Sequence, residues 1–151
     1  MSIEKEIIQS RFRNEYHKGL VNFIFTSSWV EEKLKNIFET ESITNQQYNI
    51  LRILRGAGQP VSTLQIRQRM LDKMSDTSRI VDRLEKKGLL TKVACAKDKR
   101  LVDVSINNNG RKLLERLEKM DPVIDALFGN LSDAEIKKLN SLLDKIRKSN
   151  V

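Results

Sequence analysis

The stretch SDTSRIVDRLEKKGLL, at residues 75–90, decides the fold that we expect. At about 100° per residue, four of its side chains gather on one side of a helix: Thr77, Ile80, Val81 and Leu84. Ser75 is a suitable cap for the start of this helix. Gly88 is suited to end it, since glycine adopts the left-handed conformation found after many helices. The sequence therefore predicts a short helix with one packed face and one polar outer face.

The pattern changes after Gly88. Residues 102–106 alternate apolar and polar side chains, which is typical of a half-buried strand, and residues 90–95 can pair with them. Between the two runs lies a charged tip at residues 96–100. We therefore expect a β-hairpin to follow the helix.

Capping boxes upstream predict two more helices. Thr44 stands three residues before Gln47, and Ser62 stands three residues before Gln65. A tight connection at residues 71–74 then separates the helix that begins at Ser62 from the helix that follows. Helix, short turn, helix and hairpin are the order of a winged helix-turn-helix, which we expect at residues 44–106.

Long helical patterns flank this unit. Residues 3–38 follow a helical period, and one helix of that length would extend about 50 Å and reach beyond its own subunit. Residues 110–128 continue as helix with a break at Pro122, because proline lacks a backbone donor. A capping box at Ser132 begins a last helix at 132–148. The expected fold class is mainly α with a small β-hairpin wing, in a single chain spanning 1–151.

The positive charge is concentrated in the middle of the chain. The net charge is +8, and residues 60–112 hold 13 of the 28 basic residues but only 6 of the 20 acidic ones. A localised basic surface is typical of a protein that binds a polyanion. Charge alone leaves solvated lysines as an equal alternative.

The composition excludes several kinds of site. Cys95 is the only cysteine and His17 the only histidine, so we predict no disulfide, no metal centre, no cofactor and no enzyme activity. Cys95 is better interpreted as a packed strand residue than as a redox switch. No apolar run approaches the length of a membrane span, and the acidic N-terminus lacks a signal-peptide pattern. We therefore expect a cytoplasmic protein without a membrane partner.

The outer face of the helix and the hairpin tip are the predicted contacts to double-stranded DNA. Small hydroxyls and arginines suit base edges in the major groove, and arginine suits a narrow minor groove. The expected base-reading residues are Ser75, Ser78, Arg79, Asp82 and Arg83, the expected phosphate contacts are Lys86, Lys97 and Lys99, and Arg100 is expected in the minor groove. Asp98 would orient Arg100 or Arg83. Any amphipathic surface helix has a polar outside, so the helix alone does not decide the matter.

Three stretches together resemble the multiple antibiotic resistance regulator (MarR) family. They are residues 80–89 (IVDRLEKKGL) followed by DKR at 98–100, residues 44–51 (TNQQYNIL), and residues 131–135 (LSDAE). The resemblance covers nearly the whole chain, and the combination is more specific than any one piece.

The resemblance implies a homodimer formed by the helical regions 1–40 and 108–151. Its two winged units would meet a pseudo-palindromic operator, with recognition helices in successive major grooves. It also implies a repressor that responds to a small aromatic or phenolic effector. Trp29, Tyr48 and Arg52 could line such an effector crevice, although core or interface packing is the favoured interpretation of the aromatic residues.

Arg67 departs from the family pattern. The family has Leu-Ala in the first helix of the helix-turn-helix where this chain has Ile66 and Arg67, and arginine cannot pack as alanine does. The packing or exposure of that helix is thus an open question. The alternative function is a winged-helix module that binds protein, which would not need positive charge on its recognition helix.

Overall fold

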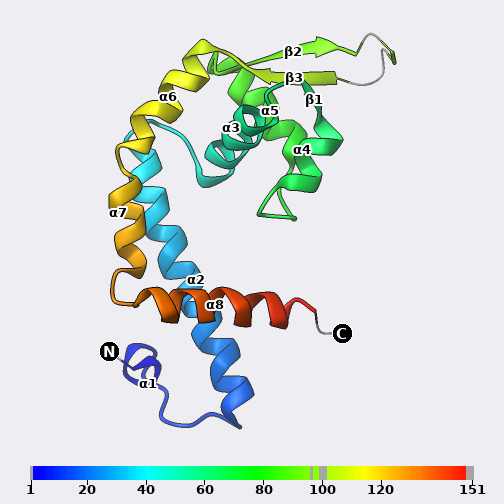
Figure 1. Cartoon of the computed structure of the whole chain (residues 1–151). Coiled ribbons are helices and arrows are strands. Elements are labelled where there is room, and N and C mark those ends of the chain that lie inside the picture. Colours follow the sequence, from blue (N-terminus) through cyan, green and yellow to red (C-terminus); the bar gives the residue numbers. More distant parts are fainter. Residues whose placement is uncertain (1, 96, 99–101, 149–151) are drawn as a thin grey trace.

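The computed structural model describes residues 2–95, 97–98 and 102–148. The chain is mainly helical, and one antiparallel sheet of three strands lies at one end of it (Figure 1). The elements in chain order are α1 Ile3–Glu6, α2 Glu15–Glu39, α3 Asn45–Ala57, β1 Val61–Ser62, α4 Thr63–Arg69, α5 Thr77–Lys86, β2 Leu90–Ala94, β3 Val102–Ile106, α6 Asn108–Glu118, α7 Asp121–Asp125, the 3-10 turn η1 Ala126–Phe128, and α8 Asp133–Ile146. The predicted fold class is confirmed.

Three of the predicted helix starts carry complete capping boxes. Thr44 caps α3, Ser62 caps α4 and Ser132 caps α8, each by accepting the backbone N–H of the residue three positions on. The fourth start differs by one residue, because Asp76 caps α5: its Oδ1 accepts the N–H of Arg79 at 3.2 Å. Gly88 ends α5 in the left-handed conformation, with φ of +71°, as predicted.

The single long helix predicted over residues 3–38 is wrong. Residues 7–14 separate α1 from α2, and Asn14 begins α2 by accepting the N–H of His17 at 2.9 Å. An asparagine side chain readily accepts a hydrogen bond from the free N–H groups at the start of a helix. A new helix therefore begins after Asn14 and is separate from α1. Lys18 holds α1 against α2 through an ion pair with Glu4 at 2.6 Å.

The core lies in the unit formed by α3, α4, α5 and the sheet, which we call the winged unit (Asn45 to Ile106), together with α6. Its fully buried side chains come from all of these helices and from β3: Ile50, Leu51, Ile66, Leu84, Val104 and Leu114. In the sheet, β3 lies between β1 and β2. Leu90 pairs with Ile106 and Val61 with Val104. The hairpin was predicted, whereas β1 has only two residues and carries no sequence signal.

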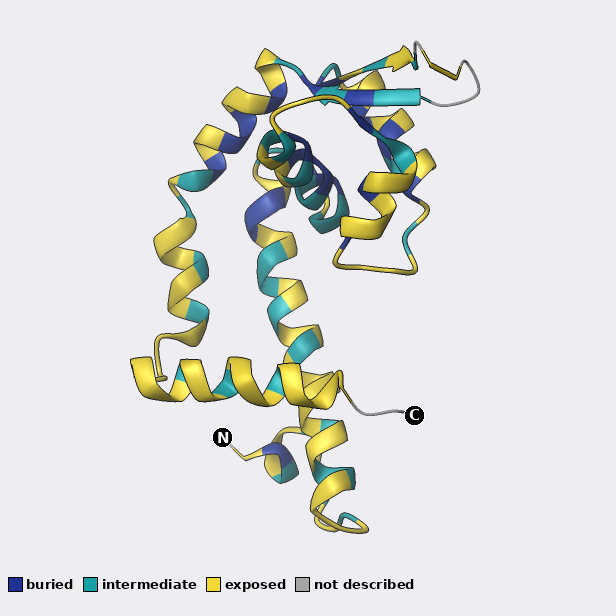
Figure 2. Cartoon of the chain, turned by 45° about the vertical axis from the view of Figure 1, so that its right-hand side comes forward, coloured by how far each residue is buried: buried dark blue, intermediate teal, exposed yellow. Residues whose placement is uncertain are grey.

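The terminal helices carry little of this core (Figure 2). The break predicted at Pro122 is present, because α6 ends at Glu118 and Pro122 lies in the first turn of α7. The last helix, α8, has no buried residue, and it lies apart from the winged unit in both views (Figures 1 and 2). Within the described part of the chain, no helix is both long and apolar enough to span a bilayer.

Candidate DNA-binding surface

The surface of interest is the outer face of α5. Thr77, Val81 and Leu84 on its inner face are at most 4 % exposed. The five remaining candidates on this helix are all exposed, as the helical period predicted: Ser78, Arg79, Asp82, Arg83 and Lys86. The packed face fixes the helix on the core. The backbone positions of the exposed residues on the outer face are therefore fixed as well.

Ser75 is not presented on this face. Its hydroxyl oxygen is shielded from solvent and lies against the carboxylate of Asp72. The pKa of Asp72 lies below its usual range because of Ser75, the N–H of Met74 and the side chain of Gln46. The expectation that Ser75 caps the helix is wrong, because the cap is the next residue, Asp76. The expected contact of Ser75 with a base stays a prediction.

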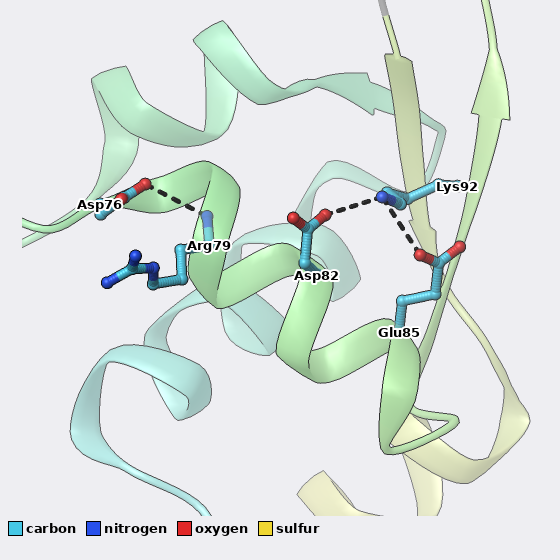
Figure 3. Close-up of polar contacts among 5 residues, drawn as sticks. All are labelled: Asp76, Arg79, Asp82, Glu85 and Lys92. Atoms are coloured by element: carbon cyan, nitrogen blue, oxygen red, sulfur yellow. Dashed lines mark hydrogen bonds and ion pairs between the residues drawn. The ribbon is translucent and has the colours of Figure 1, made fainter.

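Arg79 is available for a ligand. Its backbone N–H is used by the Asp76 cap, while its guanidinium points away from Asp82 and Lys92 (Figure 3). Within the described residues, Arg79, Arg83 and Lys86 make no ion pair. The structure thus shows three positive charges on one exposed helix face that are not held in an ion pair by a described residue.

Asp82 differs from these three because it is already paired. Lys92, on β2, places its Nζ 2.7 Å from the Asp82 carboxylate and 3.1 Å from that of Glu85 (Figure 3). The bond to Lys92 lowers the pKa of Asp82, and the bonds to Asp82 and Glu85 raise the pKa of Lys92. Asp82 keeps its charge until the pH falls through this lowered pKa, so the contact is intact at neutral pH. Asp82 thus makes a contact between α5 and the wing, and its expected role in base reading stays a prediction.

The hairpin tip is described only in part. Lys97 and Asp98 are exposed. The predicted contacts of Lys99 and Arg100 lie outside the described residues, and so does the predicted bond between Asp98 and Arg100. The contact that the structure does show between recognition helix and wing is that of Lys92. The sequence did not predict this contact, because no local pattern relates residue 92 to residues 82 and 85.

The three residues considered for an effector crevice do not form one group. Tyr48 stacks on Phe38 with ring centroids 4.1 Å apart, and Arg52 lies over the Tyr48 ring. Trp29 is 40 % exposed and has Lys33 over its ring. A separate hollow of about 460 Å³ opens between α2 and the start of α3, with Glu31, Glu32, Lys35 and Glu39 in its lining. The described residues contain no cluster of metal-ligating side chains.

Comparison with known proteins shows the family of this chain. Residues 43–102 match the model of the MarR family. The chain is 30% identical over 117 residues to the HTH-type transcriptional regulator FarR of Neisseria gonorrhoeae, covering 77% of this chain and 80% of FarR. The chain belongs to the MarR family. It is thus a DNA-binding transcriptional regulator with a winged helix-turn-helix and not a member of an enzyme family.

Solved structures of MarR-like proteins share the fold. A mutant of Escherichia coli MarR in complex with operator DNA superposes with a TM-score of 0.80 at 22% identity, covering 91% of this chain and 99% of that one. Bordetella bronchiseptica BpsR, whose DNA binding is regulated by 6-hydroxynicotinic acid, gives a TM-score of 0.80 at 20% identity, covering 93% and 100%. The MarR fold thus extends over the terminal helices as well as the winged unit.

Proposed function

We propose that this MarR-family regulator is a repressor that binds a pseudo-palindromic operator as a homodimer, with α5 of each protomer in a major groove. The observation that carries the proposal is the outer face of α5, where Arg79, Arg83 and Lys86 are exposed above a buried inner face and make no ion pair with a described residue. Arginine donates two hydrogen bonds to guanine O6 and N7, and a rigid helix places that fork reproducibly. Ser78 adds a short donor beside Arg79.

A second copy of the chain is the partner that the terminal helices require. Large apolar side chains on α2 and in the α7–α8 region are between 45% and 56% exposed: Leu20, Phe23, Ile24, Val123 and Leu142. Exposed apolar groups that recur along α2, α7 and α8 mark an interaction surface, and a two-fold axis would cover all three helices at once. We therefore propose regions 1–40 and 108–151 as the dimerisation region and residues 44–106 as the DNA-binding unit.

We also propose a small aromatic or phenolic effector. BpsR supports this proposal, because its DNA binding responds to a hydroxylated aromatic acid. The hollow between α2 and α3 lies where the dimerisation region meets the winged unit. A ligand that binds more tightly to one arrangement of the dimerisation region and the winged unit would favour that arrangement. It would thereby change the spacing of the two recognition helices in the dimer.

Selection of bound duplexes from a random pool tests the proposal. We expect enrichment of sequences with two inverted half-sites about 10 bp apart, since two-fold symmetry places recognition helices one helical turn apart. Repeating the selection with hydroxylated aromatic acids tests the effector. A pool that shows no enrichment, or only isolated half-sites bound by monomer, would contradict the homodimeric repressor.

Lys97→Ala is expected to weaken binding to every duplex by the same factor. Lys97 is exposed near the hairpin tip, and a phosphate contact carries no sequence information. The salt slope is the slope of the logarithm of the binding constant against the logarithm of the salt concentration. Its magnitude should fall by about 0.9 for each phosphate that the variant no longer neutralises. Fluorescence anisotropy of a labelled selected duplex and of a scrambled duplex, over a salt series, provides both values. Loss of affinity for the selected duplex alone would show that Lys97 reads bases.

Lys92→Gln is expected to act differently. Because Asp82 and Glu85 already neutralise Lys92, its loss should loosen the wing on α5 and lower affinity without changing the salt slope. Lys92→Arg should restore most of the affinity, since arginine can bridge the same two carboxylates. The same anisotropy series measures this. A slope that falls as it does in Lys97→Ala would mean that Lys92 contacts phosphate directly.

A further inference from the structure

Arg67 lies on the outer face of α4, outside the surface described so far. Its neighbour Ile66 is fully buried and Met70 is 1 % exposed, so these two residues fix α4 on the core. Arg67 itself is exposed. Arginine at this position therefore leaves the packing of the helix undisturbed and extends into solvent.

Arg67 lines a hollow between the two helices of the helix-turn-helix. The hollow has a volume of about 440 Å³, and Thr63 and Arg67 line it from α4 while residues 75–78 line it from the start of α5. Thr63 and Arg67 are one helical turn apart and thus share a face. Any molecule that approaches the first turn of the recognition helix from this side also approaches Arg67.

The charge of Arg67 is available within this hollow. Arg67 makes no ion pair with any residue that the structure describes. Asp76, the carboxylate in the lining, is used as the α5 cap, with the Arg79 N–H 3.2 Å from its Oδ1. Arg67 thus differs from Lys92, which also lies beside the recognition helix but is neutralised by two carboxylates.

We propose that Arg67 binds a DNA phosphate at the mouth of this hollow when α5 enters the major groove. The proposal rests on the proposed function and adds a contact from the first helix of the motif. In helix-turn-helix complexes that first helix crosses the sugar-phosphate backbone while the second enters the groove. The guanidinium fork matches two phosphate oxygens, and this contact is independent of base sequence. Arg67 would then help fix how deeply α5 lies in the groove.

Arg69 provides a matched control, because it is an exposed arginine on the same helix that does not line the hollow. We compare Arg67→Ala, Arg67→Gln and Arg69→Ala with the wild type on a selected and a scrambled duplex over a salt series. The two Arg67 variants should lose affinity for both duplexes by the same factor. Their salt slope should fall by about 0.9 per protomer. Arg69→Ala should keep the wild-type slope, and circular dichroism should show all variants folded.

Three outcomes would overturn the assignment: an unchanged slope in both Arg67 variants, the same fall in Arg69→Ala, or a loss confined to the selected duplex. The last would make Arg67 a base-reading residue. Failure of the proposed function is distinguishable, because the wild type would then bind neither duplex with a measurable salt slope. If the wild type binds and only the Arg67 prediction fails, the proposed function stands.

Discussion

Arg79→Ala is expected to lower the affinity for a selected operator by about 1–3 kcal/mol per half-site, or roughly 5- to 150-fold, and to relax discrimination at one base pair. Arg79 is the exposed arginine nearest the start of α5, and its guanidinium lies free of Asp82 and Lys92 (Figure 3). The folded state should be unaffected, because the contribution of Arg79 to the α5 cap comes from its backbone N–H. Titration of operator variants that differ at single base pairs measures both effects.

Arg69→Ala is the control for this prediction. Arg69 is also exposed but lies at the end of α4, outside the outer face of α5 and outside the dimerisation region. It should bind the operator as the wild type does. If Arg79→Ala also keeps full affinity and full discrimination, Arg79 does not read the operator.

Gly110→Ala is expected to destabilise the protein by about 1–3 kcal/mol, the usual cost of forcing an extra methyl group into packed structure. A Cβ on Gly110 would lie 2.3 Å from the Leu89 carbonyl oxygen and 2.7 Å from Cγ1 of Ile106. The first of these atoms belongs to the backbone at the base of the wing, so it cannot move without displacing the hairpin from α6. Thermal unfolding should show a fall of about 2–4 °C for each kcal/mol.

Gly56→Ala is the matched control, because Gly56 lies inside α3 and a Cβ there meets no atom within 4 Å. Alanine is favoured over glycine in a helix by about 0.5–1 kcal/mol, so this variant should melt higher than the wild type. Both variants must be compared at one protein concentration, since the melting temperature of the proposed dimer would depend on it. A melting temperature of Gly110→Ala at or above that of the wild type would contradict the close packing of α6 on the wing.

The features that the sequence predicted are those with local signals. The buried face of α5 follows from the spacing of Val81 and Leu84, and the starts of α3, α4 and α8 follow from capping boxes. The strand at residues 102–106 follows from its period-two alternation, which places Val104 and Ile106 on the buried face. The order of the elements follows from the same local signals, whereas the family resemblance implied the homodimer and its operator.

The features that the sequence missed depend on distance in space or on short elements. The Lys92 contact joins a strand to a helix, so it appears only when both are placed against the core. The α1–α2 break was missed because apolar spacing continues on both sides of it, and Asn14 was the one local sign. Arg67 was noticed as a departure from the family pattern, but its exposure depends on how Ile66 packs.

A scan of the selected operator with 7-deazapurines tests the central claim most directly. Each substitution removes the N7 acceptor from the major groove and leaves the minor groove and the phosphates unchanged. If α5 reads the major groove, particular purines in each half-site should lose affinity for the wild type, at symmetric positions. At the purine that Arg79 contacts, Arg79→Ala should show no further loss. If no position loses affinity, α5 does not bond to a purine N7 in the major groove, and the role assigned to Arg79 is wrong.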